Sequence, residues 1–284
     1  MGTKQTAPMI RARKGSGRPV VMVTAYDAPT ARVAHGAGVD VILVGDSVAM
    51  VVLGYEDTLH VTVEDMAHHT AAVARTTPDP LVVADLPWMS YHTGPADAVR
   101  NAATLIRAGA QSVKLEGGRK RLPVIDALVD AEIPVMGHLG LTPQSFHAMG
   151  GFKVQGKELD SAKALVDDAH ALAEAGCFAI VLEGIPDVVA QLITDSVPVP
   201  TIGIGAGAHC DGQVLVFHDV LGFDDRRAPK FVRRYGSLQA DAIAGLSRWA
   251  EDVRDGRFPG EAETYHLSHG MAEALAPAPV LASN

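Results

Sequence analysis

Short runs of Val, Ile and Leu recur along the chain, and stretches with helical periodicity separate them. A strand that is buried on both faces of a parallel sheet has this continuous apolar pattern. Eight strands that alternate with helices predict a (β/α)8 barrel, the TIM-barrel fold. The predicted strands are Val20–Ala25, Val39–Gly45, Leu81–Leu86, Ser112–Glu116, Pro134–His138, Ala179–Glu183, Pro200–Gly205 and Gln213–His218.

The segments between these strands carry the start and stop signals of helices. Pro95 stands at the first turn of one segment and Gly109 follows its last turn, while Gly176 follows the last turn of another segment. Proline at the start and glycine just past the end are typical of helix boundaries. The sequence predicts helices at residues 62–74, 95–108, 161–175 and 186–194.

Two segments interrupt the alternation. Gly140–Lys157 is long and polar and follows the fifth predicted strand, where barrel loops build active sites. It is a candidate lid, with an ordinary surface loop as the alternative. Gly236–Asp255 has apolar residues at helical spacing after the barrel has all of its strands. We predict one barrel domain at residues 1–265 with a C-terminal helical extension, and a flexible tail at 266–284.

Bulk composition narrows the class of protein. A net charge of −9 argues against nucleic acid as a partner. No apolar stretch approaches the ~20 residues that a membrane span needs, and no apolar segment follows the first basic residues as in a secretory signal. Two cysteines cannot staple 284 residues, so we expect a protein of the reducing cytoplasm.

Four predicted strands end at or next to an acidic residue: Asp46, Asp85, Glu116 and Glu183. A buried carboxylate is costly unless water, a cation or a polar partner meets it. The carboxyl ends of barrel strands share one rim, so we expect these side chains to converge there.

The first three of these carboxylates predict a cation site. Asp46 and Asp85 end adjacent strands, which lie about 5 Å apart, close enough for both to bind one hard cation. With few protein oxygens available, Mg²⁺ is the expected ion, completed by water and substrate. Glu116 would close the site directly or through water. For any single residue a helix cap or a local ion pair is the alternative, but three in consecutive strands favour the metal.

Lys114 and Glu183 suggest two further roles. Lys114 lies two residues before Glu116 and so points to the same face of the strand, where it would neutralise a bound carboxylate. A Schiff-base lysine is the alternative, although neighbouring acids favour the charged amine. Glu183 stands alone on the sixth strand, where a carboxylate in an apolar setting can act as a proton acceptor. Its alternative is a salt bridge at the strand end.

Two more polar residues face the same rim. Ser47 is a candidate donor to a substrate carboxylate, or else caps the next helix. His138 is a candidate substrate contact, or else a histidine satisfied within the core.

Together these groups suit an α-keto acid. A divalent ion can stabilise the enolate that forms when a base removes the proton next to the carbonyl. The residues alone therefore predict carbon–carbon bond formation or cleavage, and they do not distinguish between the two.

A series of short sequence motifs narrows the predicted reaction to one family of enzymes. In this order they resemble the ketopantoate hydroxymethyltransferase family, over most of the chain from about Thr24 to Tyr235. The strings are Gly45-Asp46-Ser47, Val52-Leu53-Gly54-Tyr55, Ala84-Asp85-Leu86-Pro87, Val113-Lys114-Leu115-Glu116-Gly117-Gly118, Thr142-Pro143-Gln144-Ser145, Gly150-Gly151-Phe152-Lys153-Val154-Gln155-Gly156-Lys157, Gly203-Ile204-Gly205-Ala206-Gly207, Cys210-Asp211-Gly212-Gln213 and Pro229-Lys230-Phe231-Val232.

The resemblance implies a barrel of the phosphoenolpyruvate/pyruvate type in a cytoplasmic homo-oligomer, typically a decamer. It implies 3-methyl-2-oxobutanoate and 5,10-methylenetetrahydrofolate as substrates, with no nucleic acid or membrane partner. By position it implies a Mg²⁺ site, keto-acid contacts and a proton acceptor. The Mg²⁺ site would be Asp46, Asp85 and Glu116, the keto-acid contacts Asp46, Ser47, Asp85 and Lys114, and the proton acceptor Glu183.

Two other functions compete with this one. The first is a lyase or mutase of the same barrel superfamily, but such lyases carry a reactive cysteine in a mobile loop, a role that suits neither Cys177 nor Cys210. The second is an inactive barrel that only binds a metabolite or a partner protein. The complete set of acidic strand ends and Lys114 argues against it.

Overall fold

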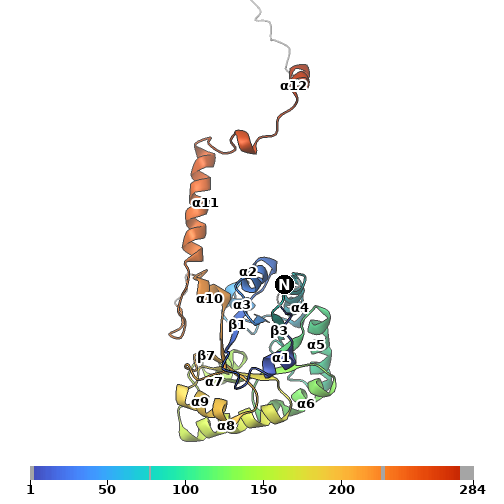
Figure 1. The fold of residues 1–284 in the computed structure, drawn as a ribbon, viewed down its shortest axis with the longest axis vertical. Helices are drawn as coiled ribbons and strands as arrows, with labels where there is room; N and C mark the ends of the chain where they lie inside the picture. Colours follow the sequence, from blue (N-terminus) through green and yellow to red (C-terminus); the bar gives the residue numbers. More distant parts are fainter. Residues whose placement is uncertain (1–2, 77, 225–227, 276–284) are drawn as a thin grey trace, which may run out of the picture. The chain divides into compact units, whose positions relative to one another are not determined.

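All eight predicted strands form, and they close into one parallel barrel in the order of the sequence (Figure 1). The predicted and observed ends differ by at most three residues, because a strand stops where its ladder of hydrogen bonds stops. The strands are β1 (Val20–Thr24), β2 (Val41–Val44), β3 (Leu81–Asp85), β4 (Ser112–Glu116), β5 (Val135–Gly140), β6 (Ala179–Glu183), β7 (Thr201–Ile204) and β8 (Gly212–Leu215).

The computed structural model describes residues 3–76, 78–224 and 228–275. The chain consists of two units, residues 1–236 and 237–284, so the predicted domain of residues 1–265 runs across the boundary between them. Within the predicted tail, residues 269–275 form a helix, whereas 276–284 lie outside the described residues. The barrel and all candidate residues belong to the first unit.

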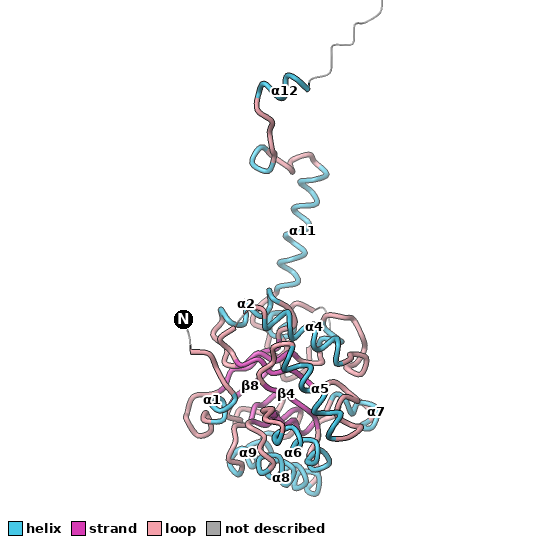
Figure 2. The backbone as a smooth tube through the Cα atoms, turned by 90° about the vertical axis from the view of Figure 1, so that its right-hand side faces the viewer, coloured by secondary structure: helices cyan, strands magenta, loops and turns pink. Residues whose placement is uncertain are grey.

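Helices surround the barrel in the first unit, outside the strands (Figure 2). The four predicted helices correspond to α4, α5, α8 and α9, while α2, α3, α6 and α10 are additional. The helices of this layer are α2 (Ala28–Gly36), α3 (Val48–Val51), α4 (Val63–Ala74), α5 (Pro95–Arg107), α6 (Leu122–Asp130), α8 (Leu159–Glu174), α9 (Asp187–Ser196) and α10 (Phe217–Leu221).

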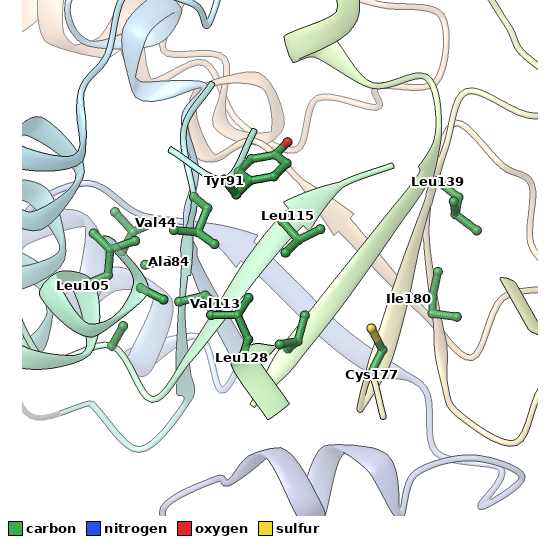
Figure 3. Packing of buried hydrophobic residues seen from close by; sticks show 14 of the residues in the cluster. Val44, Ala84, Tyr91, Leu105, Val113, Leu115, Leu128, Leu139, Cys177 and Ile180 are labelled. Atoms are coloured by element: carbon green, nitrogen blue, oxygen red, sulfur yellow. The ribbon is translucent and has the colours of Figure 1, made fainter. Parts of the chain in front are cut away.

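The two-residue period of the strands separates two apolar clusters. Leu81 and Val83 of β3 belong to the cluster inside the barrel. Val82 and Ala84 belong to the cluster between strands and helices, together with Leu105 of α5 (Figure 3). By the same alternation Asp85, like Leu81 and Val83, points into the barrel. The interior is therefore apolar along the strands and polar at their carboxyl ends.

A short helix that the sequence analysis did not predict, α1 (Ala7–Arg11), covers the amino ends of the strands. Ala7 and Ile10 join the apolar cluster inside the barrel. Just after α1, Lys14 Nζ lies 2.9 Å from a carboxylate oxygen of Asp211, which precedes β8. This end of the barrel is therefore closed by packed side chains.

The candidate lid is attached at both ends to the end of β6. It contains the 3-10 turn η2 (Pro143–Ser145) and α7 (Phe146–Met149). The backbone N–H of Leu141 donates to the carbonyl of Glu183 at 2.7 Å, and that of Gln155 donates to the carbonyl of Gly184 at 2.9 Å. Gly140 begins the segment with φ 94°, and a Cβ there would lie 2.2 Å from the Glu183 carbonyl oxygen. Only glycine permits this approach.

Within the part of the second unit that the structure describes, residues 237–275, no apolar core is present. Its main helix is α11 (Leu238–Arg254), in agreement with the predicted helix, and none of its residues is buried. Ile243, Leu246 and Trp249 are all more than half exposed. The 3-10 turn η3 (Glu261–Glu263) and α12 (His269–Leu275) follow. No described helix in either unit is both long and apolar enough to cross a bilayer.

Candidate active site

Strand register brings the predicted residues together at the carboxyl end of the barrel. Asp85 pairs with Lys114 across β3 and β4, and Glu116 pairs with His138 across β4 and β5. These four side chains are at least 95% buried. The polar residues that the sequence placed on separate strands therefore form one continuous cluster.

Asp46, Asp85 and Lys114 form one side of this cluster. The backbone N–H of Asp46 donates to Asp85 Oδ2 at 3.0 Å. Lys114 Nζ lies 2.9 Å from Asp85 Oδ1, although that oxygen has no well-aligned hydrogen-bond donor. Burial acts to lower the pKa of Lys114, but Asp85, Glu116 and Asp46 outweigh it and leave the pKa raised. The surroundings therefore favour the charged ammonium over the neutral amine that a Schiff base needs.

The cluster carries more negative than positive charge. Burial raises the pKa of Asp46 well above its ordinary range, and the neighbouring Asp85 and Glu116 raise it further. Burial also raises the pKa of Asp85, against the opposing effect of Lys114. A cation beside Asp46 and Asp85 would relieve this repulsion, and carboxylate oxygens are suitable ligands for Mg²⁺.

Protein side chains do not complete a metal site by themselves. In the described part of the chain, no group of three His, Cys, Asp or Glu side chains could hold a metal ion. Glu116 instead accepts from the backbone N–H of Gln144 at 3.0 Å through Oε2, and its Oε1 lies 3.5 Å from His138 Nδ1. The arrangement fits an ion held by two carboxylates with water and substrate, and Glu116 fits a ligand through water.

His138 connects the cation side of the site to Glu183. Its Nε2 lies 3.2 Å from Glu183 Oε2, while Nδ1 lies 3.3 Å from Lys114 Nζ and 3.5 Å from Glu116 Oε1. Burial and the nearby Lys114 act to lower the pKa of His138, but the two glutamates outweigh them and raise it to about 9. Glu183 is the one acidic residue of β6, as the sequence predicted, but it is not isolated from the other carboxylates, because His138 of β5 lies between it and Glu116. A strand pattern does not show how far the side chain of a neighbouring strand reaches.

This raised pKa predicts a pH-dependent stability. Because the pKa of His138 rises from 6.5 to about 9 on folding, its protonation stabilises the fold fully below about pH 6.5, and this contribution is lost as the pH rises through 9. Without divalent ions, the free energy of unfolding should fall by up to about 3 kcal/mol over that interval. Urea unfolding of the wild type and of His138→Asn at pH 6.5 and pH 9 measures it. Equal pH slopes in the two proteins would exclude this role.

Ser47 lies at the edge of the cluster and does not cap a helix with its side chain. It occupies the N-cap position of α3, but its hydroxyl makes no cap hydrogen bond. Its Oγ instead lies 2.8 Å from the hydroxyl of Tyr26. A hydroxyl held in this way remains a candidate donor to a substrate carboxylate.

Two residues of the site escaped the sequence analysis as functional residues. Gln144 and Tyr91 come from the loops after β5 and β3, and both are buried. The Tyr91 hydroxyl donates to Gln144 Oε1 at 2.6 Å, and Gln144 Nε2 donates to Asp46 Oδ2 at 2.8 Å. The available signal was weak: Gln144 stands within the candidate lid and within one of the strings that carry the family resemblance.

The barrel and the acidic cluster at its carboxyl end define the class of protein. Solved structures share the fold at low identity. Phosphonopyruvate hydrolase in complex with oxalate and Mg²⁺ is 16% identical, with a TM-score of 0.59 over 93% of this chain and 92% of that one. A 2,3-dimethylmalate lyase of the PEP mutase/isocitrate lyase superfamily is 18% identical, with a TM-score of 0.57 over 95% and 91%. This chain is therefore a (β/α)8 barrel.

Sequence comparison identifies the family. The family model for ketopantoate hydroxymethyltransferase matches residues 4–261. The 3-methyl-2-oxobutanoate hydroxymethyltransferase 2 of Bradyrhizobium diazoefficiens is 57% identical over 95% of this chain and 92% of its own. The 3-methyl-2-oxobutanoate hydroxymethyltransferase of Clostridium acetobutylicum is 51% identical over 96% and 99%. The chain belongs to the ketopantoate hydroxymethyltransferase family.

Proposed function

We propose that this protein transfers a one-carbon unit from 5,10-methylenetetrahydrofolate to 3-methyl-2-oxobutanoate, as a step of pantothenate and coenzyme A synthesis in the cytoplasm. The overall reaction consumes one water and yields 2-dehydropantoate and tetrahydrofolate. The observation that carries the proposal is the family match over residues 4–261. It is supported by the cluster that contains the candidate residues Asp46, Asp85, Lys114, Glu116, His138 and Glu183.

Asp46 and Asp85 would hold Mg²⁺, and Glu116 would complete the site, most simply through water. Phosphonopyruvate hydrolase, which shares the fold, was solved with Mg²⁺ and oxalate. When bound, the ion supplies positive charge that stabilises an enolate oxygen. The excess of buried carboxylates over cations in this cluster favours such an ion.

The chain's own residues would bind and orient the keto acid. Lys114 places a fixed ammonium beside Asp85, where it can neutralise the substrate carboxylate. Ser47 can donate a hydrogen bond to the same carboxylate. The substrate carbonyl would then face Asp46 and Asp85, with C3 directed to the opposite side of the site.

Glu183 would accept the proton from C3. Its side chain is 16% exposed, whereas that of His138 is only 3% exposed, so Glu183 is open to a ligand on one side. His138 would hold Glu183 in place and is a candidate substrate contact. Water would release the one-carbon unit as formaldehyde, with both carbon–nitrogen bonds of the folate broken and its two nitrogens protonated. The carbanion left at C3 would attack this carbon to form the new carbon–carbon bond, and the former formaldehyde oxygen would take up a proton and become the hydroxyl group.

The deciding experiment is solvent exchange without folate. With Mg²⁺ alone, the protein should exchange the C3 proton of 3-methyl-2-oxobutanoate for deuterium, detected by proton NMR. Addition of 5,10-methylenetetrahydrofolate should then give 2-dehydropantoate, and EDTA should stop both reactions. Cleavage of an isocitrate-like acid without any exchange would instead favour a lyase. Binding of the keto acid without exchange would favour an inactive barrel.

We also propose that the protein is a homo-oligomer, with a decamer as the expected size. The apolar residues of α11 support this, since Ile243, Leu246 and Trp249 are exposed on a helix whose own unit buries none of its residues. Sedimentation velocity measures the size directly. A monomer at micromolar concentration would contradict the proposal.

A further inference from the structure

We propose that Gln144 is a positioning residue for the cation site, where it fixes the carboxylates of Asp46 and Glu116 through separate hydrogen bonds. This inference rests on the proposed function, because it concerns the Mg²⁺ site of that reaction. It adds a residue from the loop after β5 to a site otherwise built from strand ends.

Gln144 contacts both carboxylates at once. Its side-chain Nε2 donates to Asp46 Oδ2 at 2.8 Å and to the carbonyl of Leu86 at 3.0 Å. Its backbone N–H donates to Glu116 Oε2 at 3.0 Å. The residue is only 6% exposed, so these bonds compete little with water.

Hydrogen-bond chemistry allows only one orientation of this amide. Both Nε2 hydrogens are used, and Oε1 accepts from the Tyr91 hydroxyl at 2.6 Å. A flipped amide would turn its oxygen toward the Asp46 carboxylate and the Leu86 carbonyl, which are both acceptors. Gln144 therefore has no second rotamer with satisfied bonds, and Asp46 is fixed with it.

The bond to Gln144 leaves the other oxygen of Asp46 available. Among the described residues, no hydrogen bond reaches Asp46 Oδ1. A neutral donor on Oδ2 orients the carboxylate without adding charge, whereas a cation there would compete with the metal. The role of Gln144 is thus the one that hydrogen-bonded neighbours of metal ligands have in many sites.

Tyr91 supports Gln144 from the other side. Its ring lies among the apolar residues near Leu115, and its hydroxyl points away from them (Figure 3). The guanidinium carbon of Arg121 lies 5.2 Å from the ring centroid, a cation–π contact. The side chains of Tyr91, Gln144 and Asp46 thus form a continuous chain of contacts into the site.

A purely structural reading is that Gln144 only fastens the segment 140–157 to the barrel. The two readings differ in what they predict. Fastening the segment affects stability without metal, whereas positioning the carboxylates affects the dissociation constant for Mg²⁺.

The test is Gln144→Met, which keeps the length of the side chain and the backbone hydrogen bond to Glu116. It removes only the side-chain hydrogen bonds to Asp46, Leu86 and Tyr91. Isothermal titration with MgCl₂ should show binding about 10- to 100-fold weaker than in the wild type. The matched control is Gln155→Met in the same segment, whose Nε2 bonds only to the carbonyl of Lys153. The control should bind Mg²⁺ like the wild type. Thermal unfolding in EDTA reports any loss of stability separately.

Tyr91→Phe provides the second variant. It removes the hydroxyl that holds Gln144 Oε1 and keeps the ring under Arg121, so it should weaken Mg²⁺ binding less than Gln144→Met. The double variant should bind no more weakly than Gln144→Met alone, because both act through one chain. If Gln144→Met fails to fold, the MgCl₂ titration of Tyr91→Phe tests the inference instead, and Mg²⁺ binding equal to that of the wild type would overturn it.

The outcomes separate this inference from the proposed function. If the wild type binds no Mg²⁺ and exchanges no C3 proton, the proposed function is wrong. If the wild type binds Mg²⁺ and Gln144→Met binds it equally well, Gln144 only fastens the segment and the inference is overturned.

Discussion

Replacing Glu183 with Gln should slow deuterium exchange at C3 of 3-methyl-2-oxobutanoate by about 10²- to 10⁴-fold. Loss of a positioned general base has effects of this size. The substitution keeps the shape of the side chain. In the wild type His138 Nε2 lies 3.2 Å from Glu183 Oε2, and a glutamine oxygen at the same place can accept a hydrogen bond from it. Mg²⁺ and keto-acid binding should therefore change only a few-fold.

Proton NMR of the keto acid in deuterium oxide measures the exchange rate, and titration calorimetry measures binding. Asp187→Asn is a matched control, because Asp187 is an exposed carboxylate just after the same strand. It should exchange at the wild-type rate. If Glu183→Gln exchanges as fast as the wild type, another group removes the proton.

Replacing Lys114 with Met should destabilise the metal-free protein by about 3–5 kcal/mol at pH 8. Breaking a buried ion pair on one side has this cost, because the remaining charge stays buried without a partner. Here Asp85 loses the ammonium 2.9 Å from its Oδ1, and Asp46 and Glu116 lie beside it. The loss should be smaller at pH 5, where the carboxylates can take up protons, and smaller with saturating Mg²⁺.

Urea unfolding with and without Mg²⁺ tests this expectation, and an exchange assay should show that Lys114→Met no longer acts on the keto acid. Lys120→Met is the control, since Lys120 is exposed and its replacement should change stability by less than about 0.5 kcal/mol. Equal stabilities of Lys114→Met and the wild type in EDTA would mean that the carboxylates are already protonated in the metal-free protein.

The barrel could be predicted from the sequence because each strand is short, apolar and buried on both faces. The same pattern located Asp85, Lys114 and Glu116, since each continues an inward row that begins with buried residues. The position of His138 between Glu116 and Glu183 depended on the register of β4, β5 and β6, which no single strand encodes.

Gln144 and Tyr91 could not be assigned a role from the sequence because loops have no period that orients their side chains. The two side-chain partners of Gln144 are also far from it in the sequence: Asp46 is 98 residues away and Tyr91 is 53 residues away. The helix α1 was missed for a related reason. Its five residues are too few to show a helical period, and it is held by packing against the barrel rather than by its own propensity.

From the position of that small helix we expect the two substrates to bind in a fixed order. With Ala7 and Ile10 packed into one end of the barrel, ligands can enter and leave only at the carboxyl end. The keto acid would bind at the buried Asp85 and Lys114, beneath the larger folate, so it must arrive first and leave last. The kinetics should be ordered: 2-dehydropantoate should inhibit competitively against 3-methyl-2-oxobutanoate, and tetrahydrofolate should not. A barrel that is closed at one end thus favours ordered binding and release of its two substrates and products.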